Sequence, residues 1–180
     1  MNISNKKIFI GFVIAFILVL NIYNIPLKGN DSQLMTQNNQ QLEKQQPFDI
    51  KALNTAINQS VEGNYTLSNY RKIIVTFWAT WCPSCQRENV IFNDVIKKYN
   101  KELLILGISV DKDQTALGKY LKNTPLNFPV FYNNKDIALL FDDIVAVPTH
   151  YIIDIKTNSI RKTMGLMDEK EIENIMKEKL

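Results

Sequence analysis

The sequence contains only two cysteines and a single histidine among 180 residues. Two cysteines cannot form the set of several disulfides that holds a small secreted domain together. A structural zinc site needs four ligands, which two cysteines and one histidine do not readily supply. Disulfide scaffolds and zinc modules are therefore poor explanations for this chain.

A large charge of one sign is also missing. The formal net charge is +3. Four of the 21 Lys and Arg residues and two of the 18 Asp and Glu residues precede residue 48, which leaves 17 basic and 16 acidic residues after it. A nucleic-acid-binding domain normally presents an excess of positive charge to the phosphate backbone. We therefore expect no binding to nucleic acid.

An apolar segment near the N-terminus has the length of a membrane-spanning helix. Lys6 and Lys7 precede residues 8–25, which as a helix would span roughly 27 Å, close to the hydrocarbon thickness of a bilayer. The residues that follow lack the small-x-small pattern of a signal-peptide cleavage site. We therefore expect residues 1–27 to be an uncleaved signal anchor rather than a removed signal peptide. The positive residues place the N-terminus in the cytoplasm and the remaining chain on the periplasmic or extracytoplasmic side of the cell membrane.

Residues 28–47 are rich in Gln and Asn and contain few large apolar side chains. Such a segment cannot bury enough apolar surface to fold, so we expect a flexible linker with an average reach of about 25 Å. No internal repeat is present, and residues 48–180 have the length of one ordinary domain. The predicted organisation is an anchor, a linker and one domain.

From residue 48 onward the sequence alternates short apolar runs with amphipathic stretches. This alternation is typical of an α/β fold in which helices flank a central mixed sheet. Two short strands at 48–53 and 65–67 are expected to form an N-terminal β-hairpin. Further strands are expected at 73–78, 103–110, 130–132, 149–154 and 160–164, the last two as an antiparallel pair. Helices are expected from Pro83 to about Tyr99 and at 115–122, 136–141 and 169–179.

The two cysteines, Cys82 and Cys85, form a Cys-x-x-Cys pair between a predicted buried strand and a predicted helix. Backbone N–H groups and the dipole at a helix N-terminus stabilise a thiolate, so they lower the pKa of a thiol placed there. Cys85, one turn further along, is placed to attack a mixed disulfide on Cys82 and release the product. The pattern therefore predicts a redox-active pair.

Two motifs resemble those of a known family. Residues 77–85 read Phe-Trp-Ala-Thr-Trp-Cys-Pro-Ser-Cys. This segment resembles the active-site signature of the thioredoxin superfamily, and more narrowly that of its membrane-anchored TlpA, ResA and DsbE (CcmG) branch. Residues 147–154, beginning Val-Pro-Thr, resemble the cis-proline loop of that branch. The resemblance covers residues 48–180 and implies a thioredoxin-like fold with a central helix–strand insertion at 115–132.

The resemblance also implies roles for individual residues. Pro148 should follow a cis peptide bond and lie against the cysteines, with Val147 offering backbone hydrogen bonds to substrate. The implied substrate-binding residues are Trp81, Pro83, Val147, Pro148 and Thr149. Thr76 stands where thioredoxin has a buried acid, so the proton of Cys85 needs another acceptor. Glu88, one helical turn after Cys85 and matched by a glutamate in the ResA branch, is the predicted base; the alternative is a solvated acid without a catalytic role.

As a whole, the resemblance implies a thiol–disulfide oxidoreductase that reduces or exchanges disulfides of secreted or membrane proteins, with apocytochrome c as a candidate substrate. Electrons would come from a membrane thiol carrier, because the sequence shows no flavin or nicotinamide site, and no cofactor is expected. The opposite reaction, formation of disulfides in substrates, also stays open, because the Pro-Ser residues between the cysteines do not determine the reduction potential of the pair. A copper-binding or copper-delivery module using Cys82, Cys85 and His150 is a further alternative.

Overall fold

A computed structural model of the chain describes residues 48–60 and 64–178. The predicted anchor (1–27, with its apolar segment 8–25) and the predicted linker (28–47) lie outside the described residues. Among the helices that are described, none combines the length and the apolar character needed to cross a bilayer.

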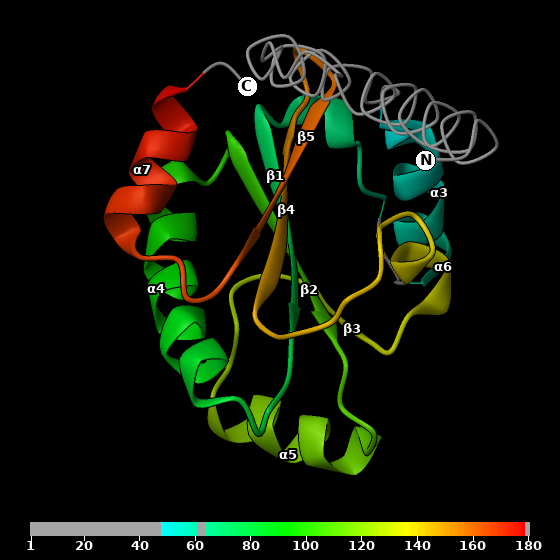
Figure 1. The fold of residues 1–180 in the computed structure, drawn as a ribbon, viewed down its shortest axis with the longest axis vertical. Helices are drawn as coiled ribbons and strands as arrows, with labels where there is room; N and C mark the ends of the chain where they lie inside the picture. Colours follow the sequence, from blue (N-terminus) through cyan, green and yellow to red (C-terminus); the bar gives the residue numbers. More distant parts are fainter. Residues whose placement is uncertain (1–47, 61–63, 179–180) are drawn as a thin grey trace, which may run out of the picture. The chain divides into compact units, whose positions relative to one another are not determined.

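A five-stranded mixed sheet forms the centre of the described domain (Figure 1). Its strands are β1 (Lys72–Trp78), β2 (Leu103–Ser109), β3 (Val130–Tyr132), β4 (Thr149–Asp154) and β5 (Ser159–Met164), arranged in the order β3-β2-β1-β4-β5. The β1–β2 and β2–β3 pairs are parallel, whereas β4 pairs antiparallel with both β1 and β5. The predicted α/β fold with a mixed sheet is therefore confirmed.

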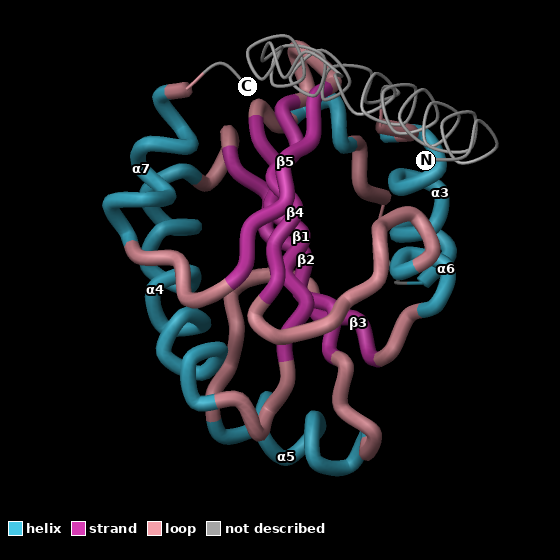
Figure 2. The backbone as a smooth tube through the Cα atoms, in the orientation of Figure 1, coloured by secondary structure: helices cyan, strands magenta, loops and turns pink. Residues whose placement is uncertain are grey.

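Helices cover both faces of this sheet (Figure 2). They are α3 (Ile50–Ser60), α4 (Pro83–Tyr99), α5 (Gln114–Asn123), α6 (Lys135–Ala138) and α7 (Glu169–Lys177), with a 3-10 turn, η2 (Leu67–Asn69). Apolar residues of α3 and α6 pack on one face of the sheet, and those of α4 and α7 pack on the other. Because both faces are covered, β1 and β2 are buried along their whole length.

The predicted N-terminal hairpin is wrong, because α3 and η2 occupy its place. The short apolar run at 48–53 indicated a strand, but the same segment can start an amphipathic helix. Leu53 and Ile57, four positions apart, are fully buried against the sheet. The carboxylate of Asp49 accepts hydrogen bonds from the backbone N–H groups two and three residues later, at 3.1 and 2.9 Å. This capping satisfies N–H groups of the first helical turn, which a strand would have paired with a neighbour.

The remaining elements follow the predicted order with small shifts at their ends. The insertion expected at 115–132 is present as α5 and β3, with β3 at the edge of the sheet. The helix expected at 136–141 is a single turn that ends at Ala138. The carboxyl ends of β1 and β2 and the start of β4 lie together at one end of the sheet, because Trp78 pairs with Ser109 and Phe77 pairs with Thr149.

Candidate active site

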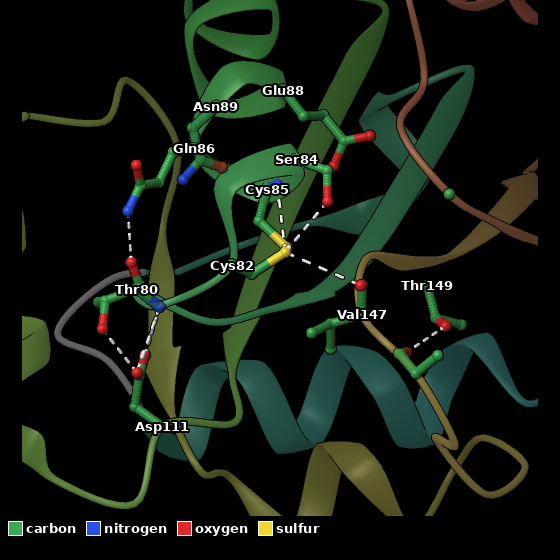
Figure 3. The surroundings of a disulfide bond; sticks show 12 residues. Thr80, Cys82, Ser84, Cys85, Gln86, Glu88, Asn89, Asp111, Val147 and Thr149 are labelled. Atoms are coloured by element: carbon green, nitrogen blue, oxygen red, sulfur yellow. Dashed lines mark hydrogen bonds between the residues drawn. A yellow bond between two sulfur atoms is a disulfide. The ribbon is translucent and has the colours of Figure 1, made fainter.

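Cys82 and Cys85 form a disulfide at the N-terminus of α4, directly after β1 (Figure 3). Cys82 is the N-cap residue, and its Sγ accepts a hydrogen bond from the backbone N–H of Cys85 at 3.2 Å. Pro83 opens the first turn, where its missing N–H leaves no hydrogen bond unmade. Cys82 is 4% exposed and Cys85 is fully buried. Cys82 is therefore the sulfur that a partner molecule reaches first.

Polar atoms surround the Cys82 sulfur on two sides. The Ser84 hydroxyl lies 3.2 Å from Sγ, and the carbonyl oxygen of Val147 lies 3.8 Å away. In the reduced protein the Ser84 hydroxyl and the N–H of Cys85 can both donate to a thiolate, and hydrogen bonds to an ionised acceptor are the stronger kind. These two donors favour negative charge on Cys82, whereas the Val147 carbonyl, which can only accept a hydrogen bond, does not stabilise it.

The loop opposite the disulfide carries the cis-proline. The Val147–Pro148 peptide bond is cis, so this part of the prediction is confirmed. The carbonyl of Pro148 accepts a hydrogen bond from the N–H of Gly165 at 2.9 Å. The Thr149 hydroxyl donates to the carbonyl of Ala146 at 2.7 Å. These bonds hold the loop so that the Val147 carbonyl faces Cys82.

The residues predicted to bind substrate lie near the disulfide at this end of the sheet, but they differ in exposure. Trp81 is 66% exposed beside Cys82, whereas Trp78 is fully buried and packs against Tyr120. Pro83 is exposed, Val147 is half-buried, and Pro148 and Thr149 are buried. Trp81 and Pro83 are thus open to a partner and Val147 is partly so, while Thr149 stabilises the loop from inside.

Glu88 is not a solvated acid, contrary to the alternative considered for it. Its side chain is fully buried, and its Oε1 accepts a hydrogen bond from the N–H of Met167 at 2.7 Å. The same oxygen lies 3.1 Å from Nε2 of His150. Because α4 begins at Pro83, Glu88 stands beyond the first turn, on the face that packs on the sheet. Its role as a base stays a prediction.

His150 lies on β4 and is fully buried. Its Nε2 faces Glu88 and also lies 3.0 Å from the carbonyl oxygen of Gly165. Within residues 48–60 and 64–178, no group of three or more His, Cys, Asp and Glu side chains is arranged to hold a metal ion. The copper alternative built on Cys82, Cys85 and His150 therefore gains no support from the geometry.

Sequence reasoning missed a second buried acid, Asp111, which anchors the loop before the cysteines. Its carboxylate accepts hydrogen bonds from the N–H of Thr80 (3.0 and 3.2 Å), from the Thr80 hydroxyl (2.7 Å) and from the Ser109 hydroxyl (2.8 Å). Gln86 of α4 donates to the carbonyl of Thr80 at 2.6 Å. The position of Asp111 just after β2 could have indicated this contact with the loop after β1, because the carboxyl ends of neighbouring parallel strands lie at the same end of a sheet.

The fold and this geometry define a thioredoxin-like protein, in which a Cys-x-x-Cys pair at a helix N-terminus faces a cis-proline loop. A sequence profile described as "AhpC/TSA family" matches residues 44–162, well over half of the chain. The chain belongs to this family. Its predicted kinship with the thioredoxin superfamily is thus confirmed.

Individual proteins agree with this assignment. The chain is 29% identical over 113 residues to "Thiol-disulfide oxidoreductase ResA" of Geobacillus kaustophilus, a match that covers 61% of this chain and 64% of that relative. The match thus spans slightly less than two thirds of the relative's own length. A thiol:disulfide interchange protein of Chlorobium tepidum has a similar structure, with a TM-score of 0.56, 26% identity and coverage of 61% of this chain and 80% of that one. StoA of Bacillus subtilis shares the fold, with a TM-score of 0.54, 20% identity and coverage of 63% and 89%.

Proposed function

We propose that this chain is a thiol–disulfide oxidoreductase working through Cys82 and Cys85. One observation carries the proposal: the disulfide sits at the N-terminus of α4, with Cys82 Sγ bonded to a backbone N–H and facing the Val147 carbonyl. The helix N-terminus and the Cys85 N–H stabilise a thiolate on the more accessible cysteine, and the second sulfur lies within bonding distance. The names of the relatives, thiol–disulfide oxidoreductase and thiol:disulfide interchange protein, support the same chemistry.

The geometry supports a two-step exchange. In the reduced protein the Cys82 thiolate attacks one sulfur of a substrate disulfide and forms a mixed disulfide, and the other substrate sulfur leaves as a thiolate. Cys85 then loses its proton and attacks Cys82 Sγ, which breaks the mixed disulfide. Two electrons pass from the cysteine pair to the substrate, which leaves with two thiols, while the pair becomes the observed disulfide.

The proposed substrates are disulfides of secreted or membrane proteins, with apocytochrome c as a candidate class. The exposed Trp81 next to Cys82 supports a protein substrate, because a large aromatic side chain offers contact area around the reacting sulfur. A membrane thiol carrier is the proposed electron donor. Reduction is the proposed direction, and disulfide formation is its competitor.

The reduction potential of the cysteine pair tests both the chemistry and its direction. Full-length protein is equilibrated with glutathione buffers of known ratio, and the thiol and disulfide forms are separated after quenching. We expect a potential near that of thioredoxin, about −270 mV, because a reductase must give up electrons readily. A value near about −120 mV, typical of a strong oxidant, would reverse the direction. Failure of the pair to exchange with glutathione at all would contradict the proposed function.

We also propose that residues 8–25 anchor the protein in the cell membrane, with residues 48–180 on the extracytoplasmic side. The support is the apolar composition of the segment and the two lysines before it. We expect the full-length protein to stay in the membrane fraction after washing with alkaline carbonate. A shorter form without the first 25 or so residues, found in the soluble fraction, would contradict the anchor.

A further inference from the structure

The segment before the cis-proline, residues 142–147, connects the α6 region to the start of β4 and contains no helix or strand (Figure 1). It ends at Val147, whose carbonyl oxygen lies 3.8 Å from Cys82 Sγ. Within residues 48–60 and 64–178, no hydrogen bond between two backbone groups involves this segment. Side chains must therefore fix the direction in which its backbone groups point.

Apolar contacts of the segment are not enough to do so. Ile144 and Val147 are partly buried and pack on the apolar cluster between the sheet and α3, whereas Val145 is 80% exposed. Apolar contacts are non-directional, so they hold the segment near the core without orienting its carbonyl groups. Hydrogen bonds do orient them, because a carbonyl oxygen accepts best near the directions of its lone pairs.

The first of these hydrogen bonds comes from Tyr151 on β4. Its hydroxyl donates to the carbonyl of Asp142 at 3.3 Å. The side chain is 3% exposed, and its ring lies 4.6 Å from the ring of Phe141, the residue directly before the segment. The ring of Phe77 stands edge-on to it at 6.0 Å. Because the ring is packed on these sides, the hydroxyl is a donor in a fixed position.

The second hydrogen bond comes from Lys162 on β5, which is the cross-strand partner of Tyr151. The Nζ of Lys162 donates to the carbonyl of Asp143 at 3.2 Å and lies 5.3 Å from the centre of the Tyr151 ring. An ammonium group over the face of an aromatic ring is attracted to it. The ring thus helps to hold the ammonium group at the carbonyl, and the two side chains bind neighbouring carbonyls of the segment.

The end of the segment is held from the same two strands. Thr149 on β4 donates to the carbonyl of Ala146, and the N–H of Gly165, directly after β5, donates to the carbonyl of Pro148. The β4–β5 hairpin therefore supplies all four donors along residues 142–148. Tyr151 and Lys162 are the two that hold the beginning of the segment.

We propose that Tyr151 and Lys162 are positioning residues for the docking of a protein substrate. By holding the carbonyls of Asp142 and Asp143, they fix the segment that presents the Val147 backbone beside Cys82. Neither side chain touches the reacting sulfurs, and neither takes part in the transfer of electrons or protons. The inference rests on the proposed function, in which a disulfide of a substrate protein reaches Cys82.

The test compares two disulfides with full-length protein. Insulin, reduced with dithiothreitol as the electron source, presents its disulfides within a polypeptide; dithiodipyridine, mixed with the reduced protein in a single turnover, has no peptide backbone to dock. In Tyr151→Phe and in Lys162→Met we expect the KM for insulin to rise about fivefold, the effect of losing one hydrogen bond of ordinary net strength. The kcat for insulin and the rate with dithiodipyridine should stay at their wild-type values.

Both substitutions keep the packing and remove only the donor, and two further variants serve as controls. Lys162→Arg keeps a donor and a positive charge over the ring, so it should restore the wild-type KM. Arg161→Met changes the next residue on β5, whose guanidinium lies 3.5 Å from Glu178 and not at the segment, so the KM should not change.

Three results would overturn the proposal: a wild-type KM in both Tyr151→Phe and Lys162→Met, an equal rise in Arg161→Met, or a KM in Lys162→Arg as high as in Lys162→Met. An equal loss with insulin and dithiodipyridine would also overturn it, because a merely structural role lowers the amount of active protein for both disulfides. Failure of the wild-type protein to reduce either disulfide would instead refute the proposed function itself.

Discussion

Replacing Cys82 with serine is expected to abolish thiol–disulfide exchange. The hydroxyl of serine does not ionise near neutral pH, so the backbone N–H of Cys85 and the helix N-terminus have no nucleophilic anion to stabilise. We expect a loss of about 10³-fold or more, within the range seen when other enzymes lose their nucleophile. Turnover of a protein disulfide with a dithiol as the electron source measures it.

Cys85→Ser distinguishes the two cysteines. This variant keeps the attacking sulfur at Cys82 but has nothing to resolve the product, so mixed disulfides with substrate should accumulate and be visible on a non-reducing gel. Ser84→Ala is the matched control, because it alters the residue between the cysteines and removes only the hydroxyl near Cys82 Sγ. Mixed disulfides on Cys85 in the Cys82→Ser variant would mean that the two roles are reversed.

Asp154→Asn is expected to destabilise the domain by about 3–5 kcal/mol, the usual result of removing one partner from a buried ion pair. Asp154 Oδ2 lies 2.7 Å from Nζ of Lys72, and the Lys72 side chain is fully buried. The substitution leaves that ammonium group buried without a counter-charge. Chemical denaturation of the wild type and the variant at pH 7 measures the difference in the free energy of unfolding.

Glu102→Gln provides the control for this prediction. Glu102 pairs with Arg71 at 3.1 Å near the same end of β1, but their side chains are 55% and 44% exposed. An exposed ion pair contributes at most about 1 kcal/mol, so this variant should unfold almost like the wild type. Similar losses in the two variants would show that burial of Lys72 is not the cause.

The same pair predicts how stability depends on pH. Burial raises the pKa of Asp154, but the hydrogen bond from Lys72 and those from the backbone of Thr157 and Lys156 outweigh it and leave the pKa below its ordinary value of 3.8. A lowered pKa in the folded state means that the stabilisation is complete above this ordinary value and is lost as the pH falls through the folded value. Asp154→Asn should therefore lack this part of the acid destabilisation.

Local sequence patterns predicted most of the fold for identifiable reasons. The run of β-branched and aromatic residues in β1 fits only a strand that is covered on both faces, and the structure buries every one of its residues. Pro83 is compatible with a first helical turn, and α4 begins there. At 48–53 the same kind of reasoning failed. An apolar run of so few residues is compatible with a strand or a helix, and packing of α3 against the sheet decided between them.

For the site, the sequence alone determined the parts that lie within one motif. The spacing of Cys82 and Cys85 brings them together on one helical turn, and the Val-Pro-Thr motif indicated the cis-proline loop through its resemblance to a family. Only the tertiary structure decided which groups from distant segments surround them. Asp111 reaches Thr80, and Glu88 meets His150 and Met167, because β1, β2, β4 and α4 converge at one edge of the sheet. Burial of a carboxylate and its hydrogen-bond partners depend on such contacts between segments, and no local pattern around Glu88 distinguishes it from a surface acid.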